Sequence, residues 1–128
     1  MPVRSSSSRV LRWPDAREVE RAATEWAKAA AGTASGIAAI GIFGSYARGE
    51  AGVGSDLDLI ILVDDSPDPF ERRPARFPVE HLPVPAEVLV YTLAEWQNLA
   101  TMSPRFASTL AHETKWLIGQ APRDPNHH

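Results

Sequence analysis

Two aspartates separated by one residue, Asp56 and Asp58, are the strongest candidates for chemistry in this sequence. They stand where an apolar segment begins, so strand alternation places both carboxylates on one side and Leu57 and Leu59 on the other. Like charges this close repel each other, and crowding them costs free energy unless a cation compensates. Mg²⁺ prefers oxygen ligands, and two such ions stabilise the attacking and leaving oxygens of a phosphoryl displacement. The pair therefore indicates a magnesium site for phosphoryl chemistry.

The residues before the pair favour this interpretation over an exposed strand start, which is the commoner origin of an isolated Asp-x-Asp. Gly44 and Ser45 follow an apolar segment. Glycine permits a tight turn and lets its amide approach a phosphate, and serine adds a hydroxyl donor. A short helix after Ser45 would point its first amides at an anion, and Arg48 on the same face can bind a terminal phosphate. Alone, the turn is ordinary and Arg48 is a solvated surface residue.

Glu87 is a third acidic candidate, because it opens another apolar segment. If that segment forms a strand beside residues 57–63, its carboxylate lies next to the Asp pair. There it can bind the metal or accept a proton from an acceptor hydroxyl. Otherwise it is a surface glutamate of an edge strand.

These candidates must be positioned by a small set of strands and helices. Short apolar segments predict buried strands, and they are residues 37–43, 57–63 and 88–91. A first helix begins at Asp15, which forms a capping box with Glu18. Its apolar face consists of Val19, Ala22, Ala23, Trp26 and Ala30.

A second helix begins after Thr92, which forms a capping box with Glu95. Its expected inward face consists of Leu93, Trp96, Leu99 and Ala100. Residues 102–104 interrupt it, a further helix follows over 106–113, and 115–118 is a last short strand or a helix end.

Bulk properties limit the class of protein. The 128 residues are enough for one hydrophobic core, and the net charge of −3 makes a nucleic-acid partner unlikely. The sequence has no cysteine, which excludes disulfides and cysteine-based zinc sites. The polar start lacks a signal-peptide core and the apolar runs are too short to cross a bilayer, so we expect no membrane association and a cytoplasmic location.

The segment from Gly41 to Leu59 resembles the signature of the DNA polymerase β-like nucleotidyltransferase superfamily. In that signature Gly-Ser is followed by ten residues and then Asp-x-Asp, and here the ten are residues 46–55. The sequences Ala-Arg-Gly-Glu and Ser-Asp-Leu-Asp-Leu within it look most like the minimal nucleotidyltransferases, the antitoxin-type partners of HEPN-domain toxins.

The resemblance implies an α/β (α+β) fold with a small mixed sheet flanked by helices. Asp56, Asp58 and Glu87 would be the catalytic residues and would bind two Mg²⁺ ions. Gly44 and Ser45, helped by Arg48, would bind the phosphates of ATP. AMP would pass to a hydroxyl of the partner, a tyrosine in the family's toxin–antitoxin members. The third acid is often aspartate in the minimal proteins, so the longer Glu87 can alter the metal geometry.

We therefore expect the chain to divide into a flexible N-terminal arm (1–14), a nucleotidyltransferase domain (15–120) and a disordered C-terminal tail (121–128). Two other functions remain open. One is a catalytically weak binding module that neutralises a partner by contact. Tryptophans could anchor its interface, although most are expected in the core. They are Trp13, Trp26, Trp96 and Trp116. The other is a nucleotidyltransferase for a small, aminoglycoside-like molecule, which usually carries an additional domain.

Residues 64–85 are rich in proline and charge, with some helix or irregular structure expected. Arg72, Arg73 and Arg76 lie within them, and a solvated loop is favoured over contact with a triphosphate, an RNA or an acidic partner. His81 and His112 have no metal-binding spacing.

Overall fold

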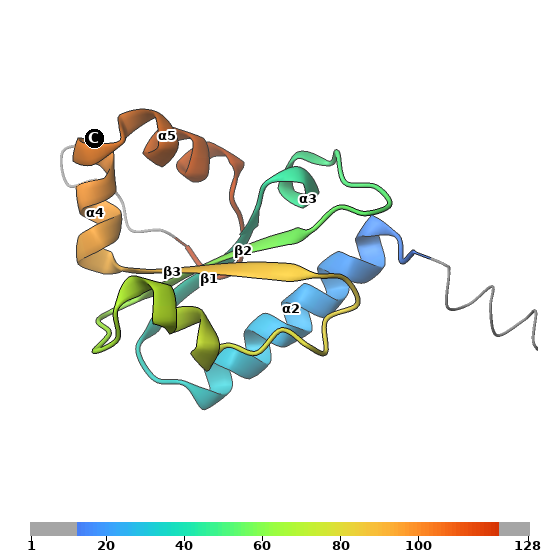
Figure 1. Cartoon of the computed structure of the whole chain (residues 1–128), viewed down its shortest axis with the longest axis horizontal. Coiled ribbons are helices and arrows are strands. Elements are labelled where there is room, and N and C mark those ends of the chain that lie inside the picture. Colours follow the sequence, from blue (N-terminus) through green and yellow to red (C-terminus); the bar gives the residue numbers. More distant parts are fainter. Residues whose placement is uncertain (1–12, 121–128) are drawn as a thin grey trace, which may run out of the picture.

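One four-stranded mixed sheet forms the centre of the structure (Figure 1). Its two inner strands, β1 (Ile37–Phe43) and β2 (Leu57–Val63), pair antiparallel. β3 (Ala86–Thr92) adds to β2 in parallel, and β4 (Lys115–Gly119) adds to β1 antiparallel, giving the order β3-β2-β1-β4. The computed structural model describes residues 13–120. Most of the expected arm and the whole expected tail lie outside the described residues.

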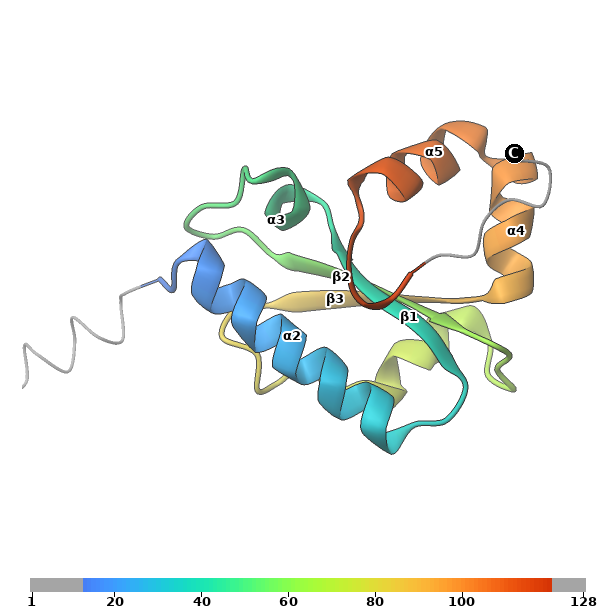
Figure 2. The same cartoon turned by 180° about the vertical axis from the view of Figure 1, so that it is seen from behind.

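Helices cover both faces of the sheet, which confirms the expected mixed sheet flanked by helices. α2 (Ala16–Thr33) lies along one face, and α4 (Leu93–Met102) and α5 (Pro104–Glu113) lie on the other (Figures 1 and 2). α2 begins with the predicted capping box, in which the Glu18 amide donates to Asp15 Oδ1 at 2.9 Å. Among the described residues, no helix is long and apolar enough to span a membrane.

Strand alternation divides the core into two clusters. On the α2 side, Leu57, Leu59 and Ile61 of β2 pack in one cluster with Val19 of α2. On the other side, Ile60 and Leu62 form a cluster with Ala39 of β1 and Leu110 of α5. Because side chains alternate, Asp58 belongs to the face of β2 that α4 and α5 cover.

The two C-terminal helices meet at the predicted interruption and are followed by a strand rather than a helix end. Leu93, Trp96 and Leu99 of α4 pack against the second cluster as expected. Ala100 does not, because it is solvent-exposed. A ten-residue helix that packs along one side buries a narrow stripe, and position 100 falls outside it.

The tryptophans belong to the packing of the domain rather than to an exposed surface, since all of them are partly buried. Trp26 donates from Nε1 to the carbonyl oxygen of Pro78 at 2.8 Å. Trp96 and Trp116 meet edge to face, with ring centroids 6.1 Å apart. The structure therefore favours the core role that the sequence predicted for most of them.

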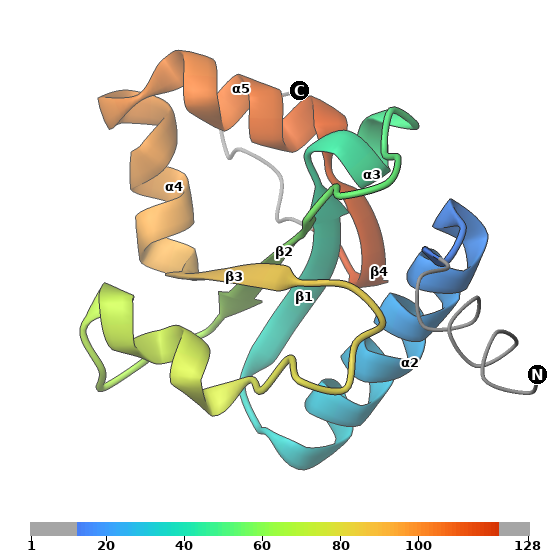
Figure 3. The same cartoon turned by 45° about the vertical axis from the view of Figure 1, so that its right-hand side comes forward.

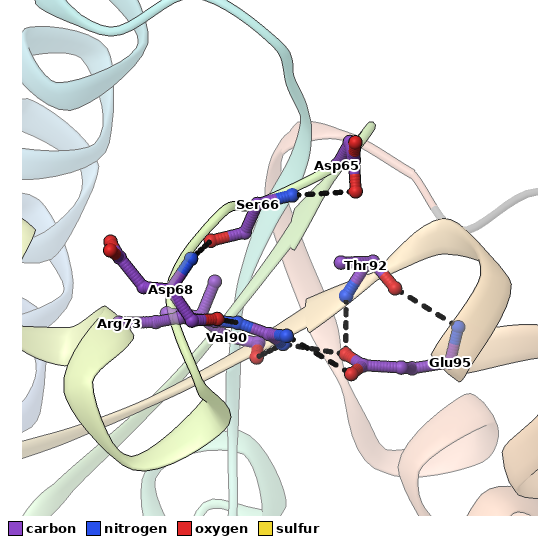
Figure 4. A network of polar contacts seen from close by, with 7 residues as sticks. All are labelled: Asp65, Ser66, Asp68, Arg73, Val90, Thr92 and Glu95. Carbon is purple, nitrogen blue, oxygen red and sulfur yellow. Dashed lines mark hydrogen bonds and ion pairs between the residues drawn. The ribbon is translucent and has the colours of Figure 1, made fainter.

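Arg73 corrects the interpretation of the basic cluster as a solvated loop. It lies in the 3-10 helix η1 (Phe70–Arg76), and only 6% of its surface is exposed. Its guanidinium donates to both carboxylate oxygens of Glu95, at 2.6 and 3.1 Å, and to the Val90 and Asp68 carbonyls (Figure 4). A buried arginine is stable only when its donors find acceptors, and here two elements supply them.

Glu95 thereby connects three elements of the fold. Its Oε1 accepts the Thr92 amide at 2.9 Å in the capping box of α4 and also accepts from Arg73 of η1. The hydrogen bond from Arg73 lowers the pKa of Glu95, so the carboxylate stays ionised at neutral pH. η1 is thus tied to the junction of β3 and α4, which supports the edge strand that carries Glu87.

We expect Glu95→Ala to lower the free energy of unfolding by about 1–3 kcal/mol, because it removes a helix cap and leaves Arg73 buried without its carboxylate. The upper limit is modest because the Glu95 side chain is 41% exposed. Urea unfolding monitored by circular dichroism measures the change. Gln97→Ala, at an exposed position of the same helix, is the matched control and should change stability by less than about 0.5 kcal/mol. Equal effects of the two substitutions would contradict the assignment.

Candidate active site

Asp58 and Glu87 occupy directly paired positions on neighbouring parallel strands. Leu57 pairs with Ala86 one residue earlier, and the Leu57 amide donates to the Pro85 carbonyl at 2.9 Å, so both strands begin in register. Glu87 was expected near the aspartates only if its strand lay beside residues 57–63, and β3 does lie beside β2. Asp56 comes just before β2 and is exposed.

Gly44 brings the turn after β1 against the same carboxylate. Phe43 pairs with Asp58 across the antiparallel strands, so the next residue lies at the head of β2. A Cβ built on Gly44 would overlap Asp58 Oδ2. Its backbone has φ 75° and ψ −150°, a region that is essentially restricted to glycine. Glycine is thus required here both by conformation and by the carboxylate.

A single helical turn, α3 (Ser45–Arg48), follows this glycine at once. The Arg48 amide donates to the Gly44 carbonyl at 3.0 Å, and the Glu50 amide donates to the Ser45 carbonyl at 2.9 Å. The first amides of a helix have no acceptor within it. The turn that begins at Gly44, against Asp58, therefore leaves its first amides without helical acceptors.

Arg48 is held by two carboxylates. Its Nε donates to Glu50 Oε1 at 2.9 Å, and its Nη1 donates to Glu113 Oε1 at 3.0 Å. Glu113 ends α5 and was not among the residues that the sequence singled out. No local pattern indicates it, because 65 positions separate it from Arg48.

Acidic side chains crowd Asp58 at the N-terminal end of β2. Partial burial raises the pKa of Asp58, and repulsion by Glu87 and by Asp56 raises it further. The positive charge of Arg48 acts in the opposite direction on the pKa of Asp58. These groups therefore all act on the same carboxylate, which a cation would stabilise in its ionised form.

These residues fit Mg²⁺ in the chemistry of their donors. All three candidate ligands are carboxylates, and Asp56 and Glu87 are solvent-exposed. Within residues 13–120, the side chains as placed form no group of three or more His, Cys, Asp or Glu able to hold a metal ion. Ordered coordination would therefore need side-chain rotation at the exposed acids, and Mg²⁺ commonly takes part of its shell from water and substrate.

The two histidines singled out in the sequence are both at the surface. His81 and His112 are exposed, and His112 Nδ1 lies 2.8 Å from the Ser108 carbonyl oxygen within its own helix.

Comparison with known proteins establishes the class. No curated protein matches this chain. Among solved structures, a crystal structure of a toxin–antitoxin with AMP-PNP matches 76% of this chain and 73% of its own chain, with 17% identity and a TM-score of 0.48. Residues 25–117 match the model of the nucleotidyltransferase domain family. The chain belongs to this family, and it is a transferase of the nucleotidyl type.

We expect Gly44→Ala to destabilise the protein more than Gly49→Ala. Both glycines have positive φ, 75° and 74°, but a Cβ at Gly49 meets nothing within 4 Å. The control substitution should cost about 1 kcal/mol for its left-handed backbone, and Gly44→Ala about 1–3 kcal/mol more, because the new methyl group displaces Asp58. Chemical unfolding measures both. Equal losses would show that the turn does not press on the carboxylate.

We expect Asp58→Asn to raise the melting temperature of the metal-free protein at neutral pH by roughly 2 °C, because it removes a carboxylate whose ionisation the fold disfavours. Since the folded-state pKa of Asp58 is raised, the cost is present above that pKa and disappears as the pH falls through it. The gap between variant and wild type should therefore narrow in acid. Thermal melts across pH test this, and a gap that widens in acid would contradict it.

Proposed function

We propose that this protein is a Mg²⁺-dependent adenylyltransferase that transfers AMP from ATP to a hydroxyl group of a partner protein. The partner that we propose is a HEPN-domain toxin, for which this chain acts as the antitoxin. The observation that carries the catalytic part is the placement of Asp58, which pairs with Glu87 and packs against Gly44. Acidic ligands and a phosphate-binding turn thereby meet at one end of the sheet.

Each residue of the site has a defined task in this reaction. Asp56, Asp58 and Glu87 would hold the two Mg²⁺ ions. The ions, when bound, supply positive charge to the carboxylates and to the triphosphate. The Gly44 amide and the Ser45 hydroxyl bind phosphate oxygens of ATP, with Arg48 beside them. Glu87 accepts the proton of the attacking hydroxyl, whose oxygen bonds to the α-phosphorus while pyrophosphate leaves.

The exposure of the site supports a macromolecular acceptor. Asp56 and Glu87 lie on the surface, where a hydroxyl carried by a second protein can approach. A hollow of about 470 Å³ is lined by Val63 and Phe77, at the opposite end of β2 from Asp58. A small acceptor bound there would lie away from the carboxylates, so this hollow does not favour the small-molecule alternative. The motif's resemblance to the minimal nucleotidyltransferases supports the HEPN assignment.

One observation keeps neutralisation by contact as a second candidate function. Met102 and Phe106, on either side of the break between α4 and α5, are 76% and 41% exposed. Apolar side chains of this size at the surface are suited to a protein interface. An experiment on catalysis must therefore measure binding as well.

The test is incubation of this protein with a HEPN-domain partner protein, Mg²⁺ and ATP labelled at the α-phosphate. We expect label on the partner, no label from ATP labelled at the γ-phosphate, and a rate at least roughly 100-fold lower for Asp58→Asn, because the metal platform is lost. Asp64→Asn, an exposed aspartate at the far end of β2, is the matched control and should transfer normally.

Binding of the partner by wild type and Asp58→Asn is compared in parallel. Transfer that persists in Asp58→Asn would refute the proposed mechanism. A complex that inhibits the partner equally well with either protein, without any label transfer, would establish the contact-only function instead.

A further inference from the structure

Arg48 lies at a junction of two elements that are distant in the sequence. It ends α3, and Glu113 ends α5, whose C-terminal end lies beside α3 (Figure 3). The ion pair between them, 3.0 Å from Nη1 to Oε1, bridges these ends. Glu50 provides the second carboxylate from the residues just after α3. Of the two acids, Glu113 is the less exposed, with 30% of its side chain accessible against 65% for Glu50.

Glu113 is placed firmly on the sheet by the residues that follow it. The Thr114 amide donates to the Leu110 carbonyl at 3.0 Å and closes the end of α5. A Cβ on Gly41 would overlap Thr114 Cγ2, so this corner packs directly on β1. β4 then pairs with β1, with Lys115 opposite Ile42. Glu113 therefore has a fixed position close to the end of the strand that leads into Gly44.

The guanidinium of Arg48 keeps donors in reserve. It has five N–H groups, and the bonds to Glu50 and Glu113 use Nε and one N–H of Nη1. The positive charge of Arg48 also acts on Asp58, because it lowers the pKa that the neighbouring acids raise. An arginine held in this way loses less rotamer freedom when a phosphate binds than an arginine that is unrestrained.

We infer that Glu113 is a positioning residue of the nucleotide site, holding Arg48 so that its remaining N–H groups meet the triphosphate. This inference rests on the proposed function, since it requires that the Gly44-Ser45 turn binds a nucleoside triphosphate. If Glu113 positions Arg48, removal of Glu113 should weaken nucleotide binding. A carboxylate can also have the opposite effect on an arginine, by competing with the phosphate. If Glu113 competed with phosphate for Arg48, its removal would tighten nucleotide binding.

The test is the dissociation constant of ATP in the presence of Mg²⁺, measured by calorimetry for a set of variants. We expect Glu113→Ala to weaken binding roughly three- to tenfold, and Glu113→Gln to weaken it less, because the amide oxygen still accepts from Arg48. Arg48→Ala should weaken binding at least as much as Glu113→Ala. The double variant should bind no worse than Arg48→Ala alone, because the two residues act through one contact.

Glu20→Ala is the matched control. Glu20 of α2 pairs with Lys115 of β4 at 2.8 Å, another ion pair between elements with similar exposure, and its loss should leave ATP binding unchanged. Three results would overturn the inference. They are tighter ATP binding by Glu113→Ala, unchanged ATP binding by Glu113→Ala, and a weakening that adds fully to that of Arg48→Ala in the double variant. Those results would leave the proposed function standing, whereas a wild type that binds no ATP would overturn both.

Discussion

The crowding of negative charge at the N-terminal end of β2 is the constraint on which the rest of the site depends. Asp58 is partly buried in a central strand, with Asp56 before it and Glu87 paired beside it, and its pKa is raised as a result. A fold selected only for stability would place an apolar or neutral residue there, as it does at Ile60 and Leu62 on the same face. The proposed function accounts for this unfavourable charge, because a cation and a polyphosphate would complete the site.

The surrounding structure supplies the rigidity that such a site needs. β1 and β2 are buried on both faces and hold the Gly44 turn and Asp58 in a fixed relation. β3 is an edge strand, and its position depends on the 3-10 helix that packs on it. Arg73 and Glu95 join that helix to the junction of β3 and α4, with the arginine almost fully buried. A polar network remote from the carboxylates thus supports the strand that brings Glu87 to Asp58.

Arg48 shows how an interaction across the fold can qualify a local motif. In the sequence it is a cation three positions after Ser45, available to a phosphate. In the structure Glu50 and Glu113 both bind it, and they raise its already high pKa. The cation therefore serves the packing of α3 against α5 as well as the charge balance of the site. Its side chain is thereby tied to a helix that the motif does not contain.

The sequence alone determined the features that depend on near neighbours. The strands at 37–43 and 57–63 have the predicted bounds, and both capping boxes are formed, because apolar runs and helix caps act within a few residues. The spacing from Gly44-Ser45 to Asp56-x-Asp58 likewise indicated the nucleotidyltransferase class, which the family match over residues 25–117 shows.

Only the tertiary structure decided which distant residues meet. The parallel pairing of β2 with β3 set Glu87 opposite Asp58, a relation that the strand pattern left conditional. The burial of Arg73, the exposure of Ala100 and the pairing of Arg48 with Glu113 likewise have no local signal. Register between strands and contacts between helix ends arise from the packing of the whole core, in which residues far apart in the chain compete for the same neighbours. The short motif thus supplies the candidate residues of the site, and the fold around it decides which of them meet.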